Sequence, residues 1–276
     1  MVTLYTKYNR ALTLRICVKA AAEQALYQGV EWAERWQWSF QGYMPVFRMA
    51  RAQGLRLVAL NVNSAAMEKV RFGGFENLPQ EDRDEYVDDK KGFIAFSQTP
   101  GFVDYVQKVV MPSYEFHARM GLLGANPSQA NFYSSRILWD EGMSNIAARF
   151  LKKGGGKKLM VIMEGADHVK FGMGSVGRMK RLAPTFQVAS VLLNPTSVDT
   201  LAKTPDTSAP LVLEMTFNEQ KVQTADGAAK TKPKGALCLA DYLWFTAPPS
   251  TSLIPPALRS VGYSERERAR AREREY

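Results

Sequence analysis

Short runs of continuously apolar residues alternate along the chain with longer segments whose apolar positions recur at helical spacing. The runs cover residues 55–62, 159–164 and 187–193. Continuous rather than alternating apolar character is typical of strands that helices cover on both faces. With the helical segments between them, these runs predict an α/β fold, a mostly parallel sheet flanked by helices.

The clearest helical pattern covers residues 131–152. Its apolar positions recur three or four residues apart and form one stripe along the helix; they are Trp139, Met143, Ile146, Ala147 and Phe150. The glycines at 154–156 predict its end. Further helices are expected over residues 23–38, 43–53 and 102–120, the last of them interrupted at Pro112.

The character of the chain changes after residue 194. Residues 196–210 are rich in Thr, Ser and Pro and predict a linker. Residues 211–217 and 237–245 predict the two strands of a small C-terminal β hairpin. The resulting division is an atypical N-terminal segment (1–22), an α/β domain (23–200), a linker with the hairpin (201–255) and a charged tail (256–276), expected to be disordered because it has little apolar surface to bury.

Composition narrows the function classes. The formal net charge is +9, but the basic residues are scattered and form no nucleic-acid-binding motif, so no nucleic acid partner is expected. No apolar run is long enough for a transmembrane segment. Cys17 and Cys238 lie far apart in no motif, which indicates a reducing compartment such as the cytoplasm.

Candidate chemistry follows the second apolar run. Ligands of open parallel sheets bind where the strands end, and this run leads into Gly165, His168 and Lys170. We expect Gly165 to allow a sharp turn and a close ligand, and His168 to serve as a metal ligand or acid–base group. Arg178 follows in a glycine-containing loop that could hold carboxylates or phosphates. The alternative for His168 is an ordinary surface or capping residue.

A second constellation lies on the predicted helix over residues 131–152. Tyr133, Arg136 and Asp140 are three or four residues apart and share one face, and Glu141 is adjacent to them. The alternative is a simple solvated face. The other histidine, His117, is expected to be a partly buried structural residue.

These segments carry a resemblance to a known family. Residues 132–143 (FYSSRILWDEGM) and 163–178 (MEGADHVKFGMGSVGR) resemble the ChaN-like haem-binding uptake family of the Tiki superfamily, and residues 43–62 fit its helix–strand unit. The resemblance spans roughly residues 29–255 and is greatest to plant and algal plastid members. The family's opening Gly-Glu-x-x-His motif has no counterpart in residues 1–22, so the domain over 23–200 is expected to be N-terminally incomplete.

The resemblance implies an α/β protein that binds haem or a related tetrapyrrole and serves in iron or haem handling in the chloroplast. Bacterial members of the family bind haem with a tyrosine as iron ligand and a histidine nearby, so Tyr133 and Tyr114 are candidates beside His168. Lys170 or Arg178 could pair with the haem propionates. The cofactor-binding residues expected on this basis are Gly165, His168, Tyr133, Arg136, Lys170 and Arg178. A homodimer is one possible oligomeric state, and an enzymatic function is less favoured than a binding function.

Two alternatives remain open. Related proteins in the superfamily imply a metal-dependent hydrolase or peptidase, in which His168 and Glu141 hold a divalent metal and Asp140, Glu141 and His168 activate water. The other alternative is a non-catalytic remnant that acts only by binding other proteins.

Overall fold

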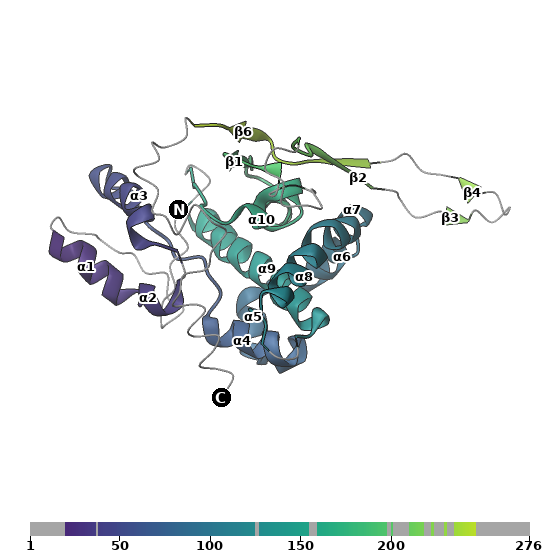
Figure 1. Cartoon of the computed structure of the whole chain (residues 1–276), viewed down its shortest axis with the longest axis horizontal. Coiled ribbons are helices and arrows are strands. Elements are labelled where there is room, and N and C mark those ends of the chain that lie inside the picture. The colour runs from purple at the N-terminus through teal and green to yellow at the C-terminus, as the bar shows by residue number, and fades with distance from the viewer. Residues whose placement is uncertain are drawn as a thin grey trace.

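The structure is a computed structural model that describes residues 20–36, 38–124, 127–154, 159–197, 200, 210–217, 222–223, 229–230 and 235–246. Helices dominate it (Figure 1). The α-helices are α1 (Ala20–Gly29), α2 (Trp32–Arg35), α3 (Phe40–Ala52), α4 (Ser64–Gly73), α5 (Gln80–Tyr86), α6 (Lys90–Ser97), α7 (Pro100–Tyr105), α8 (Met111–Arg119), α9 (Gln129–Lys153), α10 (Ala166–Val169) and α11 (Ser175–Leu182).

The helix predicted over residues 131–152 is confirmed as α9, a 25-residue helix near the centre of the molecule (Figure 1). The side chain of Ser128 caps its start by accepting from the backbone N–H of Asn131. Helices α4, α5, α8 and α11 pack around α9. This long, largely buried helix is the scaffold on which the polar site is built.

The prediction of a mostly parallel sheet is wrong. Strand pairing in the described residues is limited to three two-stranded ladders: β1 (Val191–Leu193) with β6 (Tyr242–Trp244) is parallel, and β2 (Glu214–Phe217) with β5 (Gly235–Cys238) and β3 (Val222–Gln223) with β4 (Ala229–Lys230) are antiparallel. Residues 55–62 form no strand, and residues 159–164 contain a single bridge, at Met163.

The helices explain this difference. Leu57 packs in a cluster with side chains of α1 and α3, whereas Val58 and Leu60 pack with side chains of α9 and α11. Helical neighbours thus bury the first run without a second strand. The second run is less buried, because Leu159 and Val161 are 94% and 61% exposed, and the expected sheet between the runs does not form.

The C-terminal hairpin is confirmed as β2 and β5, paired from Glu214 with Cys238 to Phe217 with Gly235. The predicted second strand, 237–245, is divided, because its later part leaves the hairpin and becomes β6 beside β1. Asp241 fixes this junction: its Oδ2 accepts from the backbone N–H and the hydroxyl of Ser190, both at 2.7 Å.

Two predicted helices differ in detail. The pattern over residues 23–38 divides into α1 and α2, because Glu31 adopts a left-handed backbone conformation with φ of 50°. The pattern over 102–120 lies within α7, a π-helix (η2, Val106–Val110) and α8, with Pro112 in the first turn of α8. Proline is tolerated there because the first turn needs no N–H donor. The helix expected over 43–53 begins earlier, at Phe40.

Within the described ranges, no helix combines the length and apolar character needed to cross a membrane. Three predictions lie wholly or largely outside these ranges: the N-terminal segment 1–22, the linker over 196–210 and the charged tail over 256–276.

Candidate functional site

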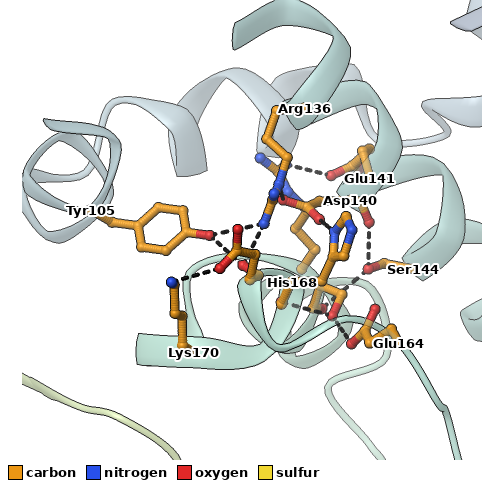
Figure 2. Close-up of polar contacts among 11 residues, drawn as sticks. Tyr105, Arg136, Asp140, Glu141, Ser144, Glu164, His168 and Lys170 are labelled. Carbon is orange, nitrogen blue, oxygen red and sulfur yellow. Dashed lines mark hydrogen bonds and ion pairs between the residues drawn. The ribbon is translucent and has the colours of Figure 1, made fainter. Parts of the chain in front are cut away.

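A short helix brings His168 against α9. Gly165 precedes α10, and the backbone N–H of His168 donates to the Gly165 carbonyl at 2.9 Å. Nδ1 of His168 lies 2.5 Å from Oδ1 of Asp140, which α9 supplies (Figure 2). Asp140 is almost fully buried, and the side chain of His168 is 12% exposed. The two polar constellations of the sequence therefore meet at one place.

The charge state of Asp140 follows from its neighbours. Oδ2 of Asp140 accepts from Nε of Arg136 at 3.2 Å. Burial opposes ionisation of Asp140, but the charge of Arg136 and the hydrogen bond from His168 outweigh it and hold the pKa of this carboxyl below its ordinary value. An ionised Asp140 can only accept, so Nδ1 of His168 donates its N–H to it, which in the neutral ring leaves the lone pair on Nε2. Within the described structure, Nε2 of His168 makes no hydrogen bond.

Tyr105 is one of the residues of the site that the sequence did not predict. Its hydroxyl donates to the carbonyl of Asp167 at 2.8 Å, and the guanidinium of Arg136 donates to the same carbonyl. Tyr105 is buried, and burial raises the pKa of its phenol. No sequence motif marks it, because a tyrosine within an apolar stretch is typical of core packing.

Glu164 and Tyr105 lie on opposite sides of His168 (Figure 2). The hydroxyl of Ser175 donates to Oε1 of Glu164 and lies 3.1 Å from the carbonyl oxygen of His168. Oε2 of Glu164 is buried and has no hydrogen-bond partner among the described residues. Burial raises the pKa of this carboxyl above its ordinary value, so a neutral form is favoured more than in water.

Glu141 points into a different network from Asp140. Its two carboxylate oxygens accept from Arg178 at 2.7 Å and from Arg181 at 2.5 Å, and Glu141 is fully buried. Arg178 is also fully buried, and its guanidinium lies over three phenyl rings at 5.1 to 5.4 Å, those of Phe93, Phe96 and Phe102. The structure therefore places Glu141 and Arg178 together in the core, and it does not bring Glu141 to His168.

The other residues predicted for the site, Tyr133, Tyr114 and Lys170, contact neighbouring groups of the protein. Tyr133 is half-buried and packs against the apolar cluster that contains Tyr105; burial raises the pKa of Tyr133. Tyr114 donates its hydroxyl to the carbonyl of Pro127 at 3.0 Å. Nζ of Lys170 lies 2.6 Å from Oδ1 of Asp167, next to His168 in the chain.

The expected need for glycine lies at Gly174 rather than at Gly165. Gly165 has φ of −66°, which any residue adopts, and a Cβ there would meet only the His168 ring at 3.7 Å. A Cβ on Gly174 would come within 2.2 Å of the His168 carbonyl oxygen. The close approach that favours glycine therefore occurs where α11 begins.

Trp139 borders the imidazole. Its ring meets that of His168 edge to face, with centroids 5.1 Å apart and an interplanar angle of 71°. The indole N–H of Trp139 donates to the side-chain oxygen of Asn61, at the end of the first apolar run. Asn61, near the end of the first run, and His168, after the second, thus both contact Trp139, although no sheet joins the runs.

Comparison with known proteins identifies the family. The model of the family described as haem-binding uptake, Tiki superfamily, ChaN matches residues 7–179, more than half of the chain. The chain belongs to the ChaN family. The resemblance to plastid members is also supported, because residues of this chain are 26% identical over 166 positions to protein RETICULATA-RELATED 5, chloroplastic, of Arabidopsis thaliana. That match covers 59% of this chain and 21% of the relative, so the chain spans about a fifth of the relative's length. No solved structure gives a significant match.

The residues present fit haem, the group that the family's description names, because His168 offers one oriented imidazole. In the part of the chain that the structure describes, no three His, Cys, Asp or Glu side chains are grouped to hold a metal ion. A tetrahedral zinc site needs three or four protein ligands, whereas the porphyrin supplies four nitrogens to haem iron and the protein adds an axial ligand.

Proposed function

We propose that this ChaN-family protein binds haem, with Nε2 of His168 as an iron ligand, and acts in iron or haem handling. The observation that carries the proposal is the 2.5 Å contact between Nδ1 of His168 and Asp140. A histidine that ligates metal through one nitrogen commonly donates the other N–H to a carboxylate, which fixes the tautomer and makes the ligating nitrogen more basic. Bound haem would supply the iron.

The residues around His168 support the same proposal. The edge-to-face Trp139 ring restricts the imidazole on one side. Lys170 lies two residues after His168 and pairs with Asp167, whose side chain is 41% exposed. A haem propionate could replace that carboxylate as the partner of Lys170, because both groups are carboxylates.

Ferric haem titration, followed at the Soret band, tests the proposal with a matched control inside the chain. The protein has two histidines, and His117 lies on α8 with Nδ1 2.7 Å from the Ser113 carbonyl. We expect a saturable shift at about one haem per chain in the wild type and in His117→Ala. We expect His168→Ala to lose this shift.

An unchanged Soret shift in His168→Ala would overturn the proposed ligand. Tyr133→Phe then becomes the informative variant, because tyrosine is the iron ligand that the family resemblance implies. Loss of the shift in Tyr133→Phe with retention in His168→Ala would assign the iron to the tyrosine.

A metal-dependent hydrolase is the second candidate. The observation that favours it is Glu164, whose carboxyl has a raised pKa beside a histidine–carboxylate pair, because acid–base chemistry commonly uses such carboxyls. Divalent metal retained after dialysis by the wild type and lost in His168→Ala would support this candidate. A protein that retains no divalent metal excludes it.

We also propose a chloroplast location, which the chloroplastic relative supports. A fluorescent fusion of the full-length protein in plant cells tests it, with fluorescence outside plastids as the contrary result. A homodimer stays a prediction, which light scattering of the purified protein would decide.

A further inference from the structure

The carboxylate that orients His168 is itself held by a second residue. Oδ1 of Asp140 faces Nδ1 of His168, and Oδ2 accepts from Nε of Arg136. Since the two oxygens have different partners, the carboxylate cannot rotate without losing one of them. The side chains of Arg136 and Asp140 are 11% and 2% exposed, so water cannot readily replace either contact.

Arg136 also holds the backbone next to the imidazole. Its guanidinium donates to the carbonyl of Asp167 and lies 3.4 Å from the hydroxyl oxygen of Tyr105, which donates to the same carbonyl (Figure 2). A guanidinium is planar and presents its donors in fixed directions. Arg136 therefore fixes two groups relative to each other: the carboxylate that accepts the hydrogen bond of the imidazole and the peptide that carries the imidazole.

We infer that Arg136 is the positioning residue of the His168 site: by bridging the Asp140 carboxylate and the Asp167 carbonyl, it keeps the ring proton on Nδ1 and the lone pair on Nε2. The inference rests on the proposed function for its consequence, iron ligation. The effect on the imidazole itself exists in the haem-free protein and is measured there. Tyr105 supports Arg136 through the shared carbonyl.

A purely structural ion pair is the competing explanation. Arg136 and Asp140 are four residues apart on α9, and such pairs commonly stabilise a helix. Loss of a structural pair changes the free energy of unfolding but leaves the tautomer of His168 unchanged. The decisive measurement must therefore report on the ring nitrogens of His168.

The ¹⁵N chemical shifts of histidine in the haem-free full chain provide this readout, in a His117→Ala background that leaves His168 as the single histidine. We expect one dominant tautomer, protonated at Nδ1, with Arg136 intact. Arg136→Gln should give a mixture of tautomers. Arg149→Gln is the matched control, because Arg149 lies on the same helix and pairs with Asp88, yet both side chains are well exposed, at 39% and 42%.

Haem affinity gives a second readout. Loss of a residue that orients a metal ligand typically weakens binding by about 10- to 100-fold, so we expect Arg136→Gln to bind haem that much more weakly than Arg149→Gln. Arg136→Lys keeps the charge without the planar fork and should fall between them. If Arg136→Gln does not fold, Arg136→Lys and Tyr105→Phe decide the matter by the same two readouts.

An Nδ1-protonated His168 with wild-type haem affinity in the Arg136 variants would overturn the inference. This result is distinct from failure of the proposed function. If His168→Ala binds haem as the wild type does, the iron ligand is wrong, while the ¹⁵N shifts still decide whether Arg136 positions the imidazole.

Discussion

His168 and Asp140 lie 28 positions apart in the chain, yet Nδ1 of one and Oδ1 of the other are 2.5 Å apart. The contact joins α10 to α9. It depends on a carboxylate that stays ionised although it is buried, because Arg136 and His168 outweigh the effect of burial on the pKa of Asp140. A change that removes the charge but keeps the shape should therefore separate orientation from packing.

Asp140→Asn is expected to weaken haem binding by about 10- to 100-fold, because the amide is a poorer acceptor for the imidazole N–H and no longer balances Arg136. Removing one partner of a buried ion pair typically costs about 3 to 5 kcal/mol, so urea unfolding should also show a lower free energy of unfolding. Asp88→Asn, in an exposed pair with Arg149, is the control. Equal haem affinity of the two variants would contradict the role of Asp140.

Glu141→Gln tests whether Glu141 is a structural residue or a metal ligand. It leaves the fully buried Arg178 without its carboxylate, so the free energy of unfolding should fall by about 3 to 5 kcal/mol. Asp88→Asn should cost at most about 1 kcal/mol, because its pair with Arg149 is exposed. Haem and metal binding of the folded Glu141→Gln protein should stay at wild-type levels. A selective loss of bound metal would instead support the hydrolase reading.

Gly174→Ala should disturb the site through the backbone of His168. The new Cβ would lie 2.2 Å from the His168 carbonyl oxygen, so either α10 or the start of α11 must move. We expect a loss of stability of about 1 to 3 kcal/mol, typical of overpacking, together with weaker haem binding. Gly165→Ala is the matched control, since its Cβ would meet the His168 ring at an ordinary 3.7 Å. Similar melting temperatures for the two variants would refute this expectation.

Glu164→Gln should change how stability depends on pH. Burial raises the pKa of Glu164 above its ordinary value of 4.5. Between that value and the raised one, the folded state holds a proton that the unfolded state has lost, so this carboxyl makes stability fall as the pH rises. Glutamine does not ionise, so the variant should gain stability relative to the wild type as the pH rises above about 4.5.

Urea unfolding of the wild type and of Glu164→Gln, measured in steps of about 0.5 pH units from about pH 4 to about pH 8, gives this difference in the free energy of unfolding. A difference that stays constant across the range would show that Glu164 ionises in the folded protein as it does in the unfolded chain.

Sequence periodicity predicts the helices better than the sheet. The stripe through Trp139 and Met143 identifies α9 because a helix buries a face that is visible in the sequence. The apolar runs at 55–62 and 159–164 do not show by themselves whether they form strands. A strand needs a second strand to pair with, and an apolar run can instead pack directly on helices. β6 pairs with β1 because the chain changes direction at Asp241, and no sequence pattern predicts this turn.

Some residues of the site could likewise be predicted from the sequence, and others could not. Arg136, Asp140 and His168 could be predicted because they belong to chemically distinctive residue types at helical spacing or after an apolar run. Tyr105 could not, because its role comes from a contact with the Asp167 carbonyl across the fold. Glu141 and Arg178 look like site residues in the sequence, and only their mutual burial shows that each neutralises the other.

Consecutive residues of α9 serve two networks that share no side chain. Asp140 faces His168 and Arg136, while Glu141 faces Arg178 and Arg181, since neighbouring positions on a helix are rotated by about 100°. The rotation of α9 about its own axis is therefore fixed by the contacts of Asp140 and by those of Glu141. Inserting a single residue between Arg136 and Asp140 would rotate both carboxylates relative to the first part of α9 by about 100°, so neither network could keep all its contacts.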